Sequence, residues 1–166
     1  MNIYDAIDSW AAAIAANTTI QTYCTTNFSR GLLVQVDDDD ETPISSPDAP
    51  YCLLYAYTGG DDSPVTDKRV QAARIVVGTV SSGNPHVPTV TTERNDTTNG
   101  LRKFGAGNTC VDLLDNVLAA IRGVTLSDNC SLIVSASYDV SGLLLFPLHV
   151  AGTTVQIEEA NDMSTF

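Results

Sequence analysis

The densest group of chemically active side chains is an acidic run made of Asp37, Asp38, Asp39, Asp40 and Glu41. A calcium or magnesium site of the EF-hand type needs oxygen ligands at alternate positions and a turn-forming glycine, and this run has neither. Consecutive side chains of an extended segment point in alternate directions, so calcium or magnesium binding by these carboxylates is the least favoured of three interpretations. The pattern therefore favours a solvated loop, with a functional electrostatic patch as the alternative.

Groups suited to acid–base or nucleophilic catalysis are isolated along the chain. His86 lies between Pro85 and Pro88 in a predicted loop, and His149 lies beside Pro147 in a predicted strand. A catalytic triad needs a nucleophile close to its base, and the chain has no G-x-S-x-G elbow. We therefore expect surface or interface positions for both histidines and predict no catalytic residue.

The cysteines are too widely spaced to form a local metal or redox motif. The chain has no C-x-x-C pair, whereas zinc ligands usually come in pairs a few residues apart. We interpret all four cysteines as reduced thiols of a cytosolic product, three of them on segments expected to be buried. They are Cys24, Cys52, Cys110 and Cys130. A disulfide or a zinc site is the alternative, and no metal or cofactor is predicted.

Two further patterns are typical of binding sites but lack part of the motif. Gly105-Ala106-Gly107 precedes a predicted helix and could present N–H groups to an anion, but no strand comes directly before it and no P-loop lysine follows. A flexible lead-in to the helix is favoured. Tyr51, Tyr55 and Tyr57 share one side of a predicted strand, where base stacking would need interleaved basic residues. A core or subunit-interface role is favoured.

Composition limits the classes of partner. With 8 basic and 20 acidic residues the net charge is −12, which argues against binding to the phosphate backbone of a nucleic acid. A hydrophobic content of 43% in 166 residues is typical of one globular domain. No apolar run is long enough to cross a bilayer, and no Lys or Arg precedes Arg30, so we expect neither a membrane span nor a secretory signal.

The elements that must position these residues can be read from hydrophobic periodicity. Asn2 can cap a first helix in which Ile3, Ile7, Trp10 and Ile14 share one face, followed by a turn or two around residues 20–28. A second helix is predicted from Asn108 or Thr109 to Arg122. Alternation predicts the strands 32–36, 51–57, 69–81, 131–140 and 143–157, the last two joined by a turn near Ser141-Gly142.

Together these elements predict an α+β fold. We expect a mostly antiparallel sheet of about five strands with two helices packed on it, forming one domain over residues 1–157. Residues 81–107 are predicted to be a long irregular loop that carries the basic cluster Arg94, Arg102 and Lys103, a candidate docking loop. Residues 158–166 are predicted to be an acidic tail.

The order of these elements resembles a known family. A strand that begins at Pro50-Tyr51, the arginine-containing strand 69–80, the Ala/Leu-rich helix 111–121 and the segment 138–143 leading into the last strand recur in this order. The pattern covers most of the chain. It is similar to that of the tail-terminator, or tail-completion, proteins of long-tailed bacteriophages.

The resemblance implies a structural virion protein of the tail and neck, made in the host cytoplasm. Such proteins form a hexameric ring that caps the tail tube, ends its polymerisation and joins the tail to the head-neck connector. DNA then passes through without specific binding, and an acidic lumen suits this passage. We hypothesise that residues 37–41 line or rim the lumen, and that the 81–107 loop docks on the tube or neck.

Two alternatives stay open. One is another head–tail connector protein or a tail-tube subunit, which needs a hairpin arm for stacking into open-ended polymers. The other is a small acidic ligand-binding domain or enzyme, whose distant acidic residues would have to converge on a pocket.

Overall fold

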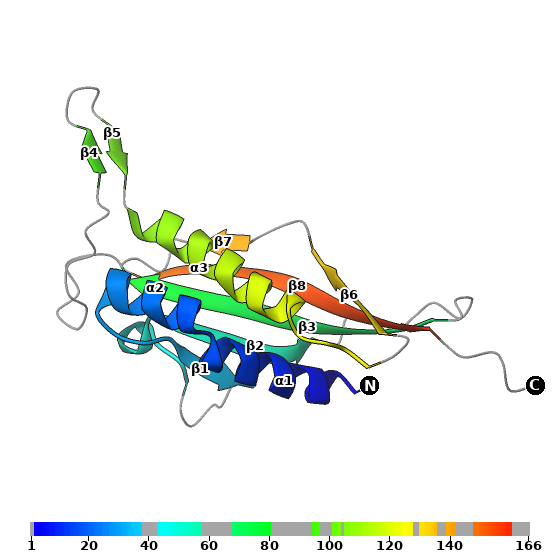
Figure 1. Ribbon diagram of the computed structural model, residues 1–166. Helices are drawn as coiled ribbons and strands as arrows, with labels where there is room; N and C mark the ends of the chain where they lie inside the picture. Colours follow the sequence, from blue (N-terminus) through cyan, green and yellow to red (C-terminus); the bar gives the residue numbers. More distant parts are fainter. Residues whose placement is uncertain are drawn as a thin grey trace, which may run out of the picture.

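The computed structural model describes residues 2–37, 43–57, 68–80, 94–96, 101–103, 105–127, 130–135, 139–141 and 148–160. Within these ranges the protein has an α+β fold in which three α-helices lie on one face of a mixed sheet (Figure 1). The helices are α1 (Ile3–Ala16), α2 (Thr18–Phe28) and α3 (Gly105–Arg122). The predicted α+β class is therefore confirmed.

Helix α1 forms as its sequence predicts. The side-chain oxygen of Asn2 accepts a hydrogen bond from the Tyr4 N–H at 3.3 Å and so caps the first turn. Ile3, Ile7, Trp10 and Ile14 recur on one face and are all buried. This face anchors the N-terminal part of the chain to the sheet.

Asn17 joins α1 to α2. Its backbone N–H donates to the Ile14 carbonyl at 3.2 Å and ends α1, while its side-chain oxygen accepts from the Ile20 N–H at 3.1 Å and starts α2. The sequence predicts two helices and the structure has a third among its described residues, because the turn or two expected here is a complete helix. Ile20, Cys24 and Phe28 follow at intervals of four and are buried, but seven of the eight other α2 side chains are polar and mask this period.

Replacing Asn17 tests this junction. Asn17→Ala removes the oxygen that accepts the Ile20 N–H, and we expect it to lower the free energy of unfolding by about 0.5–2 kcal/mol. Asn17→Asp keeps an acceptor in place and should lose much less. Urea unfolding followed by circular dichroism measures both variants. Equal losses in the two would show that the cap does not hold the junction.

The sheet is built around a long antiparallel pair. β3 (Lys68–Val80) pairs with β8 (Leu148–Ala160) along its whole length, and β2 (Tyr51–Tyr57) lies antiparallel to β3 on the other side. β6 (Cys130–Val134) adds to β8, and β1 (Leu33–Val36) adds to β2, which gives the order β1-β2-β3-β8-β6. The predicted sheet of about five strands is confirmed in outline; a short sixth strand, described below, also pairs with β8.

One strand pair departs from the predicted antiparallel pattern. β1 runs parallel to β2, with Leu33 opposite Tyr51 and Val36 opposite Leu54. A parallel pair needs a connection long enough to return to the same end of the sheet, and residues 37–50, which include the 3₁₀ turn Ser46–Asp48, provide it. The sheet is therefore mixed. The sequence predicts both strands but carries no signal for their relative direction.

The stretch 81–107 is not irregular throughout. It contains two short antiparallel strands, β4 (Arg94–Asp96) and β5 (Leu101–Lys103), and its last residues belong to α3, which begins at Gly105. Gly105-Ala106-Gly107 is therefore the first turn of the helix and not a flexible lead-in. Strands of three residues are too short for alternation to reveal, and two glycines conceal a helix start.

The closing strands also differ from the prediction. The expected strand 131–140 is divided into β6 and β7 (Asp139–Ser141), and Ser141 pairs with Val150. A tight turn at Ser141-Gly142 is therefore wrong. β8 begins directly after Pro147, which has no N–H to donate. It continues through Glu158 and Glu159, both predicted to be tail; residues 161–166 lie outside the described part.

The apolar core lies between the helices and one face of the sheet. α3 contributes Leu113, Leu114, Val117, Leu118 and Ile121, all fully buried. Each helix therefore presents its apolar side to the same sheet face. The consequence for function is that the other face has no helical cover among the described elements (Figure 1).

Candidate functional site

The sheet face turned away from the helices, here called the open face, has a distinct character among the described residues. Cross-strand partners share a face and successive residues alternate, so the register defines its members. On the three central strands they are Tyr51, Leu53, Tyr55 and Tyr57 of β2, Val70, Ala72, Arg74, Val76 and Gly78 of β3, and Val150, Gly152, Thr154, Gln156 and Glu158 of β8. The stripe of tyrosines predicted to share one side of a strand lies here.

The open face is apolar with few charges. Arg74 lies near its centre, where its guanidinium donates to the Thr154 hydroxyl at 3.3 Å. The Tyr51 ring lies directly over Gly78, where a Cβ would meet the ring atoms. Burial raises the pKa of Tyr51 to about 12, so it stays neutral. Tyr57 remains 51% exposed. A weakly charged aromatic surface of this kind is suited to contact with another protein.

Two edge strands, β1 on one side of the sheet and β6 on the other, form a second distinctive feature; β6 shares its side with the short β7, which carries Asp139. β1 reads LVQV and β6 reads CSLIV, with no charged residue and no proline in either. Leu33 is 40% exposed, Val36 37% and Ile133 40%. Soluble proteins usually protect edge strands with charges, prolines or bulges, because an open edge can pair with another chain. The sequence alone does not single out these residues, because it does not show which strands lie at the edges.

The predicted acidic patch is described only at its first residue. Asp37 follows β1 directly, is exposed, and has a left-handed backbone with φ of 60°. Its N–H donates to the Leu54 carbonyl at 2.8 Å, and its own carbonyl accepts from the Gln35 side chain at 3.1 Å. These bonds fix the end of the edge strand. Asp38, Asp39, Asp40 and Glu41 lie outside the described residues.

The predicted basic cluster falls on one hairpin. Arg94 and Lys103 are directly opposite each other in the β4–β5 pair, and Arg102 is opposite Asn95. The hairpin extends away from the main sheet, beyond the start of α3 (Figure 1). The backbone therefore brings the three cationic positions together on a projecting arm.

His149 is not at the surface, contrary to expectation. It is 8% exposed on the helix side of β8, and burial lowers its pKa, so it stays neutral. Its carbonyl accepts a hydrogen bond from the Cys110 thiol at 3.4 Å, in the packing between α3 and the sheet. His86 lies outside the described part. Among the described residues, no three His, Cys, Asp or Glu side chains form a group that could hold a metal ion.

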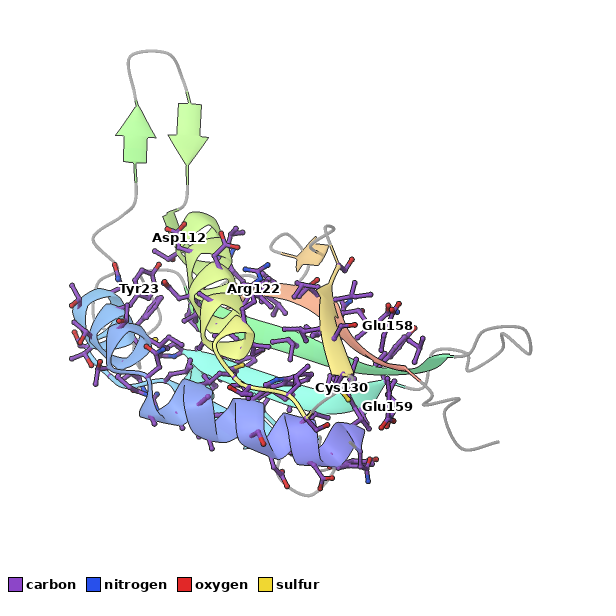
Figure 2. All side chains as sticks on the ribbon, turned by 45° about the vertical axis from the view of Figure 1, so that its right-hand side comes forward. Tyr23, Asp112, Arg122, Cys130, Glu158 and Glu159 are labelled. Atoms are coloured by element: carbon purple, nitrogen blue, oxygen red, sulfur yellow. The ribbon has the colours of Figure 1, made fainter. Side chains whose placement is uncertain are left out.

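All four cysteines are free thiols, and only Cys130 is accessible. Burial raises the pKa of Cys24 to about 12 and that of Cys110 to about 11, so neither is a thiolate at neutral pH. Cys52 is fully buried as well. Cys130 starts β6 beside Glu159 of β8, at the end of the sheet where Figure 2 also shows Glu158.

A chromogenic thiol reagent should therefore distinguish one cysteine from three. At neutral pH we expect the folded protein to react rapidly at Cys130 alone, and all four thiols to react once urea unfolds the chain. Cys130→Ser should abolish the rapid phase and leave the slow one unchanged. Rapid reaction of a second thiol would contradict the burial of Cys24, Cys52 and Cys110.

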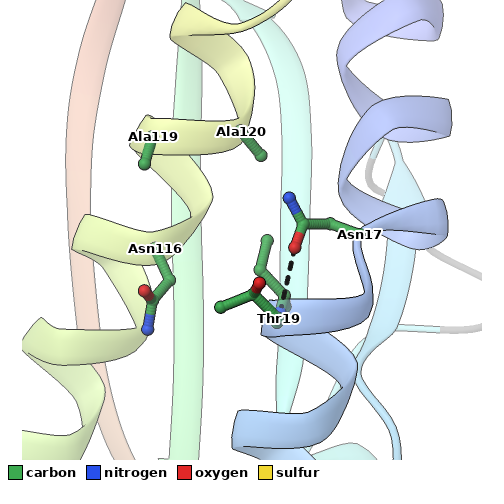
Figure 3. Close-up of a pocket in the computed structure, with 6 residues that line it drawn as sticks. Asn17, Thr19, Asn116, Ala119 and Ala120 are labelled. Atoms are coloured by element: carbon green, nitrogen blue, oxygen red, sulfur yellow. Dashed lines mark hydrogen bonds between the residues drawn. The ribbon is translucent and has the colours of Figure 1, made fainter.

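The helical side has a small hollow among the described residues. The hollow, of about 180 Å³, lies between the α1–α2 junction and α3 and is lined by Asn17, Thr19, Ile20, Asn116, Ala119 and Ala120 (Figure 3). It is smaller than typical ligand pockets of about 300–1,000 Å³, and the Asn17 oxygen is already used as a cap.

A hydrogen bond joins two of the helices. The Tyr23 hydroxyl donates to the Thr109 carbonyl at 3.1 Å and ties α2 to the start of α3 (Figure 2). Burial and the Asp112 carboxylate both raise the pKa of Tyr23. These groups serve packing.

Neither a membrane-spanning helix nor a similar known protein points to a function. Among the described residues, no helix combines the length and the hydrophobicity needed to span a bilayer. No protein-family model matches the chain, and no curated protein matches it.

Proposed function

We propose that this protein is a structural component of the tail of a long-tailed bacteriophage. It forms a ring that caps the tail tube, ends its polymerisation and joins the tail to the head-neck connector. The observation that carries the proposal is the one-sided covering of the sheet, which leaves an apolar open face and two edge strands without charged residues, β1 and β6, for contact with other subunits. The order of elements along the chain adds the resemblance to tail terminators.

The roles of the chemically capable side chains also support a structural function. Cys110 bonds to backbone carbonyls, Tyr23 ties two helices together, and His149 is packed under α3. Each of these groups has a role in packing: Cys110 and His149 are buried, and the hydroxyl of the half-buried Tyr23 is bonded to the chain. A net charge of −12 per subunit suits a channel that DNA crosses without adhering, since an acidic wall repels phosphates.

A second candidate function is that of a tail-tube subunit. The β4–β5 hairpin favours it, because a projecting arm with cationic positions can reach a neighbouring copy along a tube axis. The two functions differ in the assembly that they require. A terminator closes into a ring and stops, whereas a tube subunit adds to itself without limit.

Light scattering after size exclusion, with negative-stain images of the main peak, separates these functions. Closed rings of about six subunits are expected, the number that the resemblance implies. Filaments would replace the terminator by the tube subunit. A monomer would be mixed with purified tail tubes, and capping that stops tube elongation would keep the proposal. A monomer that leaves tubes unaltered would refute it.

A further inference from the structure

The directions of the strands make the two edges of the sheet compatible with each other. β1 and β2 run one way, β3 the opposite way, β8 returns to the first direction and β6 reverses it again. β1 and β6 are therefore antiparallel to each other. When copies are related by rotation about an axis along the strands, β6 of one copy meets β1 of the next as an antiparallel pair.

The backbone groups that the edge strands turn away from their neighbours in the sheet fall on matching residues. The N–H groups of Leu33 and Asp37 donate to the carbonyls of Pro50 and Leu54, on the side of β1 where β2 lies. Because backbone groups alternate in direction along a strand, Val34 and Val36 turn their N–H and C=O groups outward. On β6, Ser135 donates to the Thr154 carbonyl of β8, so alternate residues 131 and 133 face β8. Leu132 and Val134 turn their backbone groups outward.

Side-chain orientation then selects a register. Val34 and Val36 lie on the helix side of the sheet, as do Cys130 and Leu132, because each shares a face with its cross-strand partner. Placing Val34 opposite Leu132 sets Val36 opposite Cys130. The same register brings Leu33, 40% exposed, opposite Ile133, also 40% exposed, on the open face.

This register pairs uncharged residues, although the Cys130 N–H already donates to the Ser127 carbonyl at 3.1 Å and is not available to Val36. Gln35 comes opposite Ser131, and no charged residue enters the contact. Val34 and Leu132 exchange backbone N–H···O=C bonds, while the side chains left partly exposed at both edges cover one another. Each edge strand thus finds hydrogen-bond partners and apolar contacts in the opposite edge strand of the neighbouring copy.

We propose that β1 of one copy pairs with β6 of the next, Val34 opposite Leu132, and continues the sheet from subunit to subunit. The partner is a second copy of this chain. The inference deepens the proposed ring and rests on it for the head-to-tail direction, since two β1 strands or two β6 strands would pair only in closed dimers.

Cysteine trapping tests the pairing. Gln35→Cys with Ser131→Cys is made in a Cys130→Ser background, so that the remaining native thiols are buried. Positions 35 and 131 form a non-hydrogen-bonded pair in the proposed register, with Cα atoms about 4.5 Å apart, within disulfide range. Within one chain β2, β3 and β8 separate the two edges, so any bond joins two copies. The free protein is oxidised at its highest soluble concentration in high salt, which screens the net negative charge.

Three controls accompany the double variant. Gln35→Cys alone reports β1–β1 pairing, and Ser131→Cys alone reports β6–β6 pairing. Gln35→Cys with Ile133→Cys reports a register slipped by two residues. We expect a ladder of linked multimers on non-reducing gels from the 35/131 variant only, with the linked peptides identified by mass spectrometry.

The outcomes separate this inference from the proposed function. Dimers from either single variant, stronger linking at 35/133, or no linking in the assembled protein, whether free or on tail tubes, would overturn the pairing. Rings in negative stain without a 35–131 bond would refute the pairing and keep the ring. A 35–131 ladder from a protein that neither closes into rings nor caps tail tubes would keep the pairing and refute the tail function.

Discussion

Ile133→Lys is expected to turn the assembled protein into a folded monomer. Ile133 lies on the edge strand β6, 40% exposed, and in the proposed contact it faces Leu33 of the next copy. A lysine there places a charge against an aliphatic side chain at each interface. An uncompensated buried charge costs about 3 kcal/mol or more, which weakens each contact about 100-fold.

Light scattering measures the loss of assembly, and circular dichroism shows that the fold remains. Tyr4→Lys is the matched control, because Tyr4 is 52% exposed on α1 and the substitution changes the net charge equally. It should assemble as the native protein does. Adding Leu33→Asp to Ile133→Lys offers the lysine a carboxylate across the contact and should restore part of the assembly. Unchanged assembly of Ile133→Lys would place the interface elsewhere.

Trp10→Ala is expected to give the largest loss of stability. Trp10 is fully buried between α1 and the sheet, and its removal leaves a cavity that the surrounding residues cannot fill. Large-to-small substitutions of this kind cost about 3–5 kcal/mol, a large share of the 5–15 kcal/mol that is typical of a domain. Trp10→Phe should cost less, because it keeps most of the ring and removes an indole N–H that has no hydrogen-bond partner among the described residues.

Urea unfolding measures both variants, best in the monomeric Ile133→Lys background, where association does not add to stability. Tyr4→Ala, on the exposed side of the same helix, is expected to change the free energy of unfolding by no more than about 0.5 kcal/mol. A Trp10→Ala loss as small as that of Tyr4→Ala would mean that α1 does not carry the core. A Trp10→Phe loss as large as that of Trp10→Ala would mean that the indole N–H has a partner.

Sequence patterns predict the fold where local signals agree. α1 has a cap and a clear apolar period, and the strands β2 and β3 alternate strongly, so all three lie where they are predicted. α2 is underestimated because threonines surround its three buried residues. The break between β6 and β7 and the long connection to β8 depend on pairing with β8, which is a tertiary property.

The candidate assembly surface is predictable only in part. The period of Tyr51, Tyr55 and Tyr57 places them on one side of a strand, but which side the helices leave open follows from packing. Leu33 and Ile133 look like ordinary strand residues in the sequence. Their significance comes from the strand order, since the same residues at the centre of a sheet would have neighbours on both sides.

Because the two edges of the sheet differ, the proposed pairing between them determines the size of the assembly. A contact between unlike edges contains no stop of its own, so copies add until the last edge reaches the first. The angle between successive copies, which the twist of the shared sheet sets, then fixes the number of subunits. Substitutions that alter strand twist near β1 or β6 should change the diameter of the assembly while leaving the strength of each contact nearly the same.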